Sequence, residues 1–151
     1  MLFSRRSKTA KPSCITRLLV VEDDPLVAFD HELTLKTAGY RLAATVNSGE
    51  AAVTVLAEQP IDAVILDLNI AGPISGADVA RLAHDRGVAV LVVSAGEVGV
   101  AAQHAYGHLP KPLGHGALVA ALRTMEQQIC KGEAPRPVPG LTIFMPAPST
   151  V

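Results

Sequence analysis

Short apolar runs alternate along this chain with segments in which apolar residues recur every three or four positions. An unbroken apolar run suits a strand of a parallel sheet covered on both faces, whereas the longer spacing suits an amphipathic helix. The central run begins at Ile61 and ends in the single carboxylate of Asp67. The predicted strands span residues 18–21, 41–46, 61–69, 88–93 and 107–110.

Helix start and stop signals separate these strands. Asp24-Pro25 has the residue types of an N-cap and a first helical position, and Gly39 ends the first helix. Its apolar stripe consists of Leu26, Phe29 and Leu33. The remaining helices are predicted after Ser48, after Ser75 with Asp78 as a capping box, weakly over residues 97–106, and clearly over residues 117–130.

The two ends of the chain lack this periodicity. Residues 1–16 mix basic and small polar residues, which predicts a flexible basic arm. Residues 131–151 contain five prolines, and we expect a tail that is disordered or docks through its apolar segment, residues 141–145. The folded domain is therefore expected over residues 17–130.

Five strand–helix repeats with short connections predict an α/β fold, with a doubly wound five-stranded parallel sheet. The expected arrangement is the flavodoxin-like strand order 2-1-3-4-5. In such sheets, ligands bind at the carboxyl ends of the strands, where the strand order reverses. The residues that follow the strands are therefore the candidates for a site.

Composition narrows the function further. The chain has 151 residues, 49% of them apolar, and a formal net charge of −1, so it has no general basic field for nucleic acid. Cys14 and Cys130 lack the spacing of a zinc site or a disulfide framework, which favours reduced thiols and a cytoplasmic protein. No apolar run approaches the roughly 18 residues of a membrane span.

Polar residues of matching chemistry follow four of the predicted strands. Glu22 and Asp23 follow the first, Asp67 ends the third, and Ser94 and Lys111 follow the fourth and fifth. Three carboxylates at one edge would repel one another unless a cation joined them, and oxygen ligands favour Mg²⁺. A carboxylate beside a metal and a lysine suits phosphoryl transfer to Asp67.

With these residues in place, the sequence resembles the receiver domains of two-component response regulators, the CheY-like family, from Leu18 to about Cys130. The matching stretches are Val20–Pro25, Val64–Asn69, Val92–Ala95 and Lys111-Pro112.

The resemblance implies a role for each site residue. Asp67 would be the phosphoacceptor, Asp23 a direct ligand of Mg²⁺, Glu22 a ligand through water, and Asn69 a ligand through its backbone carbonyl. Ser94 would follow the phosphoryl group on activation, Lys111 would be the family's lysine, and the Lys111-Pro112 bond would be cis.

The same resemblance implies a stand-alone response regulator. A sensor histidine kinase or a histidine phosphotransfer protein would donate the phosphoryl group, and a downstream protein would recognise the modified surface. The chain would not be an enzyme beyond assisting its own phosphoryl transfer and hydrolysis. No nucleic acid and no membrane partner is expected.

Three departures from the family pattern leave alternatives open. The loop from Asp67 to Gly76 is one residue longer, the segment from Ser94 to Lys111 is shorter, and His108 replaces the usual switch aromatic. A receiver fold that binds partners without phosphorylation is therefore a second hypothesis, and a small phosphoaspartate hydrolase ranks last. His108 would either pack as a neutral ring or couple pH to the switch. The other histidines, His31, His84, His104 and His115, are expected at the surface or at helix caps.

Overall fold

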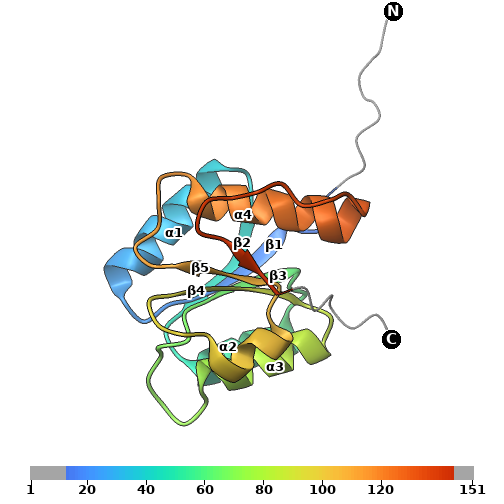
Figure 1. Cartoon of the computed structure of the whole chain (residues 1–151). Coiled ribbons are helices and arrows are strands. Elements are labelled where there is room, and N and C mark those ends of the chain that lie inside the picture. Colours follow the sequence, from blue (N-terminus) through green and yellow to red (C-terminus); the bar gives the residue numbers. More distant parts are fainter. Residues whose placement is uncertain (1–12, 145–151) are drawn as a thin grey trace, which may run out of the picture.

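The apolar runs become the strands of one sheet that lies between two layers of helices (Figure 1). The computed structural model describes residues 13–144. The strands are β1 (Arg17–Val21), β2 (Arg41–Val46), β3 (Ala63–Leu66), β4 (Ala89–Ser94), β5 (Gly107–Pro110) and β6 (Thr142–Ile143). The helices are α1 (Pro25–Thr37), α2 (Gly49–Glu58), α3 (Gly76–Asp85), α4 (Ala117–Met125), the 3₁₀ segment η1 (Gly99–His104) and the π-helical segment η2 (Glu126–Cys130).

The strand order is β2-β1-β3-β4-β5-β6. The first five strands pair in parallel, which confirms the predicted order 2-1-3-4-5, and β6 adds an antiparallel sixth strand. Val21 of β1 is level with Leu66 of β3, and Leu66 is level with Val92 of β4. The residues that follow these strands therefore emerge at one edge of the sheet.

Each face of the sheet has its own hydrophobic core. Leu18 and Val20 of β1 face a cluster beneath α1 and α4, whereas Leu19 and Val21 face a cluster beneath α2 and α3. Successive residues of a strand point to opposite faces, so both sets are buried and β1 reads as a continuous apolar run. β3 and β4 are buried throughout for the same reason.

The predicted helix starts are confirmed. The Asp24 carboxylate accepts hydrogen bonds from the backbone N–H groups of Leu26 and Val27 at the start of α1. Ser75 and Asp78 form the expected capping box at the start of α3. The weak fourth helix is the single 3₁₀ segment η1.

The apolar stripe of the first helix faces solvent, contrary to the sequence interpretation. Leu26, Phe29 and Leu33 are 80%, 66% and 58% exposed. The buried residues of α1 are His31 and Leu35, one turn apart. Residues two apart are separated by about 200° around a helix, so Leu35 and Leu33 cannot both face the core, and the helix buries Leu35.

Both ends of the described chain pack on the domain. Ile15 is buried in the core cluster beneath α1 and α4, and the Ser13 hydroxyl donates to Glu126 at 2.6 Å. Most of the predicted arm, residues 1–12, lies outside the described residues. Of the two alternatives for the tail, the structure has the docked one: the segment meets Thr124 near the end of α4 and forms β6 against β5. Residues 145–151 lie outside the described residues.

A disulfide joins Cys14 to Cys130, with Cα atoms 5.5 Å apart. The expectation of reduced thiols is wrong in this structure, because spacing in the sequence does not show which distant residues the fold brings together. The cysteines therefore give no support to a reducing compartment. Within residues 13–144, no helix has the length and apolar character needed to cross a bilayer.

Candidate functional site

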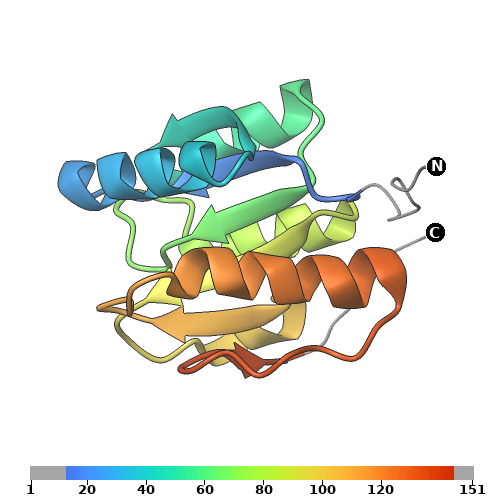
Figure 2. The same ribbon diagram turned by 90° about the horizontal axis from the view of Figure 1, so that it is seen from above.

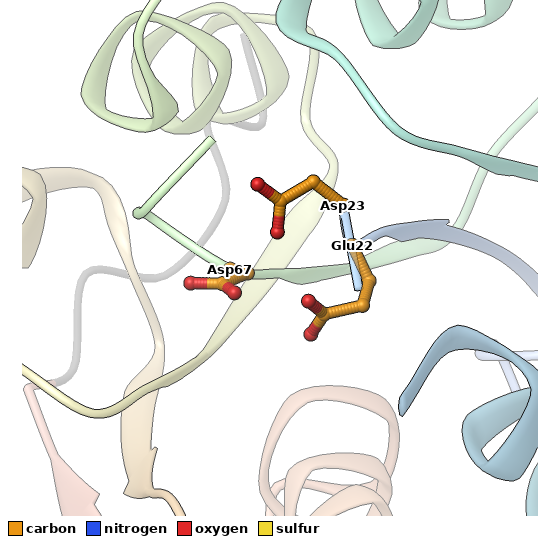
Figure 3. Close-up of side chains that lie close together, drawn as sticks. All are labelled: Glu22, Asp23 and Asp67. Atoms are coloured by element: carbon orange, nitrogen blue, oxygen red, sulfur yellow. The ribbon is translucent and has the colours of Figure 1, made fainter. Parts of the chain in front are cut away.

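The acidic residues that follow β1 and β3 converge at the carboxyl edge of the sheet (Figure 3). One carboxylate oxygen of each of Glu22, Asp23 and Asp67 lies within 4.8 Å of the others. Glu22 and Asp67 are 3% and 6% exposed, whereas Asp23 is exposed. The cluster therefore has two oxygens held by the protein interior and one that faces solvent.

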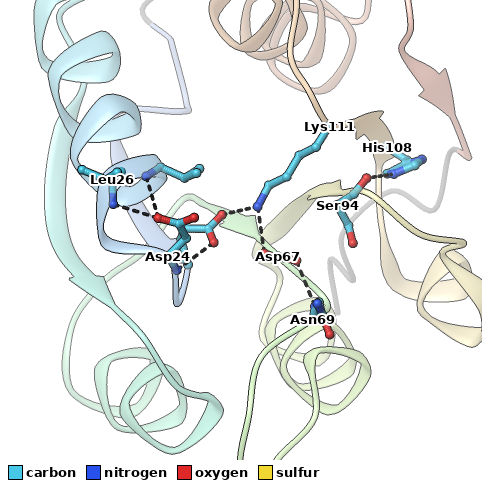
Figure 4. Close-up of polar contacts among 9 residues, drawn as sticks. Asp24, Leu26, Asp67, Asn69, Ser94, His108 and Lys111 are labelled. Atoms are coloured by element: carbon cyan, nitrogen blue, oxygen red, sulfur yellow. Dashed lines mark hydrogen bonds and ion pairs between the residues drawn. The ribbon is translucent and has the colours of Figure 1, made fainter.

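Lys111, the residue after β5, joins two of these acids (Figure 4). Its Nζ lies 2.6 Å from Glu22 Oε1 and 2.9 Å from Asp67 Oδ2. The other oxygen of Asp67 accepts a hydrogen bond from the Asn69 backbone N–H at 2.9 Å. Glu22 Oε2 accepts from the Asp24 backbone N–H at 3.1 Å. Both buried carboxylates are therefore held in fixed orientations by two donors each.

Burial and these contacts shift the pKa values of the two buried acids in opposite directions. Burial raises the pKa of Glu22 above its usual range, although Lys111 and the Asp24 amide oppose the change. Burial acts on Asp67 in the same direction, but the hydrogen bonds from Lys111 and Asn69 outweigh it and hold the pKa of Asp67 below its usual range. Burial disfavours the lysine ammonium, yet its two carboxylate partners raise the pKa of Lys111. Asp67 is thus kept ionised, the state that a nucleophilic carboxylate needs.

The ionised Asp67 opens into a hollow of about 480 Å³ at the surface. Its walls come from the loops after β3, β4 and β5: Asp67, Leu68, Asn69, Ser94, Ala95, Gly96, Glu97 and Lys111. All six predicted site residues thus lie at this edge of the sheet: Glu22, Asp23, Asp67, Asn69, Ser94 and Lys111. The hollow offers room for a small anionic group between a carboxylate, a hydroxyl and an ammonium.

Tight backbone packing positions the loop between Asp67 and α3. A Cβ added at Gly76 would lie 2.6 Å from Leu68 Cα, and one added at Gly49 would collide with the Ile74 backbone carbonyl. Only a residue without a side chain permits these approaches. The longer loop is therefore seated against the N-termini of α2 and α3, which fixes the start of the loop where Asp67 lies.

Ser94 and Lys111 are linked through the backbone and through His108. Ser94 is 3% exposed, and its backbone carbonyl accepts a hydrogen bond from the Lys111 backbone N–H at 3.2 Å. The same carbonyl accepts a hydrogen bond from His108 Nε2 at 3.0 Å, which requires a proton on Nε2 (Figure 4). The Lys111-Pro112 bond is cis, as the sequence comparison with the family implied.

His31 lies in the protein interior, contrary to the prediction from the sequence. It was expected at the surface or at a cap, but it is 3% exposed, and its Nε2 has no hydrogen-bond partner among the described residues. Burial, followed by repulsion from Lys111, lowers the pKa of its imidazole. Its spacing of four residues from Leu35 was the one signal that could have placed both on the buried face.

The acidic cluster has the donor chemistry of a magnesium site. Carboxylate oxygens together with a backbone carbonyl are the ligands that Mg²⁺ takes in proteins. Glu22, Asp23 and Asp67 bring one oxygen each within 4.8 Å of the others, although Lys111 and backbone N–H groups already donate to Glu22 and Asp67. The residues present therefore fit a hard divalent cation held by these carboxylates.

Comparisons with known proteins agree with this architecture. The sequence profile of the response regulator receiver domain matches residues 18–123. A search of curated proteins finds no match. A CheY-like receiver domain protein from Methanospirillum hungatei JF-1 superposes with a TM-score of 0.70 at 15% identity, covering 79% of this chain and 99% of that one. The response regulator TrrA from Thermotoga maritima, in complex with Mg²⁺-BeF, gives 0.65 at 24% identity over 72% of this chain and 97% of that one.

The structural similarity shows a shared fold, and the profile match covers most of the chain. The site residues lie at the strand ends where this fold binds ligands. By its sequence profile and its fold, the chain belongs to the response regulator receiver domain family of two-component signalling.

Proposed function

We propose that this chain is a stand-alone response regulator that accepts a phosphoryl group on Asp67 from a histidine kinase or a histidine phosphotransfer protein. The observation that carries the proposal is the position of Asp67, with one oxygen 2.9 Å from Lys111 Nζ and its side chain lining a hollow that Ser94 also lines. The phosphorylated chain then binds or releases a downstream protein. We expect this exchange to take place in the cytoplasm.

The proposed reaction moves one phosphoryl group between two side chains. An oxygen of Asp67 forms the new P–O bond as the P–N bond to the donor's histidine breaks, and the released imidazole takes up a proton. Mg²⁺ bound by Asp23, Asp67 and the Asn69 carbonyl, with Glu22 acting through water, would neutralise phosphoryl charge. Lys111 contributes a positive charge 2.9 Å from Asp67 Oδ2, and Ser94 offers a hydroxyl to a phosphoryl oxygen.

We further propose that the chain is not an enzyme beyond assisting its own phosphorylation and the later hydrolysis of the acyl phosphate. In this reaction Asp67 is the phosphoacceptor and the donor's histidine is the leaving group.

Intact-mass measurement after incubation with acetyl phosphate and Mg²⁺ tests the proposal. We expect one added phosphoryl group on the wild-type chain, none on Asp67→Asn, and one on Asp85→Asn, an exposed aspartate at the end of α3 that serves as the matched control. A beryllofluoride titration, which needs no covalent step, detects a competent site whose acyl phosphate hydrolyses quickly. Absence of both signals, or a phosphoryl group that persists on Asp67→Asn, contradicts the assignment.

A second candidate is a receiver fold that binds partners without phosphorylation. The strand β6 on the edge of β5 and the replacement of the switch aromatic by His108 favour it. It predicts that a stably folded Asp67→Ala chain keeps its signalling in cells. Loss of signalling by that variant would support the phosphorylation-dependent function.

A further inference from the structure

The C-terminal segment covers the edge of the sheet that β5 would otherwise leave open (Figure 2). The segment is anchored at its start, where Thr124 Oγ1 of α4 accepts from the Arg136 backbone N–H at 2.7 Å. It then turns and pairs antiparallel with β5, and the Phe144 backbone N–H donates to the Tyr106 carbonyl at 2.8 Å. An edge strand with unpaired N–H and C=O groups is a template for another strand, and here the chain's own segment occupies it.

β5 is shaped for a close backbone neighbour at this edge. A Cβ added at Gly107 would lie 2.6 Å from the backbone carbonyl oxygen of Thr142. Gly107 is the first residue of β5, and a glycine in a strand often marks a place where another backbone approaches closely. Gly107 therefore admits a strand that any larger residue would push away.

The cover is nevertheless short and incompletely packed. Only two residue pairs join the strands, Gly107 with Ile143 and His108 with Thr142. Thr142 is exposed, and Leu141 and Ile143 are only partly buried. A hollow of about 590 Å³ remains between β6 and the loop after β4, lined on the strand side by His108, Thr142 and Phe144. So short a ladder contributes little stability by itself.

We propose that the edge of β5 is a docking surface for an extended segment of a partner protein, and that β6 is its internal competitor. The chain's own segment shows what chemistry fits. Leu141 and Ile143 pack on the core cluster beneath α1 and α4, and Phe144 packs on the cluster beneath α2 and α3. The partner segment is therefore an antiparallel strand with two apolar side chains on one face and an aromatic ring on the other.

The docking surface shares a wall with the site at Asp67. The loop residues Ala95, Gly96 and Glu97 line both the hollow beside Asp67 and the hollow beside β6. Ser94 connects the two hollows. It lines the one beside Asp67, and its backbone carbonyl accepts a hydrogen bond from Nε2 of His108, which lines the one beside β6. Strand docking does not itself require phosphorylation, and only its control by Asp67 rests on the proposed function.

A labelled peptide of residues 138–144 provides the probe, with fluorescence polarisation as the readout. The full-length variant Ile143→Asp/Phe144→Asp removes the apolar anchors of β6 and leaves β5 unchanged. Since a covered edge weakens the apparent affinity by the fraction of open molecules, we expect this variant to bind the peptide about tenfold or more tightly than the wild type. Adding Gly107→Ala should abolish that binding, whereas adding Gly114→Ala, which meets nothing within 4 Å, should leave it unchanged.

Equal affinity of the Ile143→Asp/Phe144→Asp variant and the wild type overturns the docking proposal, and so does binding that survives Gly107→Ala. A wild-type dimer that Gly107→Ala dissolves would identify a second copy's strand as the occupant and would also overturn it. Hydrogen exchange of the wild type gives a test that needs no variant: amides of residues 141–144 should exchange far faster than those of β4, and equal protection refutes a displaceable strand. These results are independent of the mass measurement at Asp67, so either proposal can fail alone.

Discussion

Replacing Lys111 by methionine tests whether the lysine holds the acidic cluster together. The substitution keeps the length of the side chain and removes the ammonium that lies 2.6 Å from Glu22 and 2.9 Å from Asp67. Breaking a buried pair by removing one partner costs about 3–5 kcal/mol, because the remaining charge is left without compensation. The lysine side chain is 21% exposed, so solvent screening reduces this, and we expect a loss of about 2–3 kcal/mol in the free energy of unfolding.

Urea unfolding without divalent cations measures the loss, with Lys36→Met on the exposed last turn of α1 as the control. Adding Asp67→Asn to Lys111→Met removes one of the stranded carboxylates, and we expect it to restore about 1 kcal/mol or more. Saturating Mg²⁺ should restore part of the loss as well, since a bound cation replaces the missing positive charge. A loss no larger than that of Lys36→Met, or a double variant that is simply additive, would refute the reasoning.

Three further predictions concern the framework around the site. Burial lowers the pKa of His31 below 6.5, so the unfolded chain binds more protons than the folded chain between the two values, and stability should fall as the pH drops below about 6.5. Thermal unfolding across this range should show a weaker pH dependence in His31→Leu and an unchanged one in the exposed His115→Leu; equal slopes in all three chains contradict the prediction. Gly49→Ala should lose about 1–3 kcal/mol, because its Cβ meets the backbone carbonyl of Ile74, which cannot rotate away. Gly114→Ala is the matched control in urea unfolding, and an equal effect of the two would exclude a steric cause. The disulfide spans 116 residues of sequence, so Cys14→Ser/Cys130→Ser should lose about 2–4 kcal/mol. Reductant should destabilise the wild type by the same amount and leave the double variant unchanged, and a wild type insensitive to reductant would contradict the prediction.

The sequence was sufficient wherever local chemistry decides the structure. The buried strands are visible in the sequence as apolar runs. Asp24 and Ser75 predicted the starts of α1 and α3, because their side chains accept hydrogen bonds from the first N–H groups of each helix. The convergence of Glu22, Asp67 and Lys111 followed from the rule that parallel strands end at one edge. These inferences needed no knowledge of what packs against what.

The failures concern contacts between distant parts of the chain. On α1, two apolar faces compete, and only packing beneath the helix decides that Leu35 is buried and Phe29 is exposed. The prolines of the tail left open whether it is disordered or docked, and only the free edge of β5 decides that residues 142–143 become a strand. The pairing of Cys14 with Cys130 likewise depends on the fold bringing the two ends together.

The disulfide between Cys14 and Cys130 closes residues 14–130 into one covalent loop. This covalent ring contains all five parallel strands and every residue of the site, whereas β6 lies in the segment that follows Cys130. A single cut by a protease in the exposed loop around Gly72 would therefore open the ring without separating the strand that carries Asp67 from the one that carries Lys111. In denaturing gel electrophoresis, such a nicked chain would migrate as one band without reductant and as two bands after the disulfide is reduced.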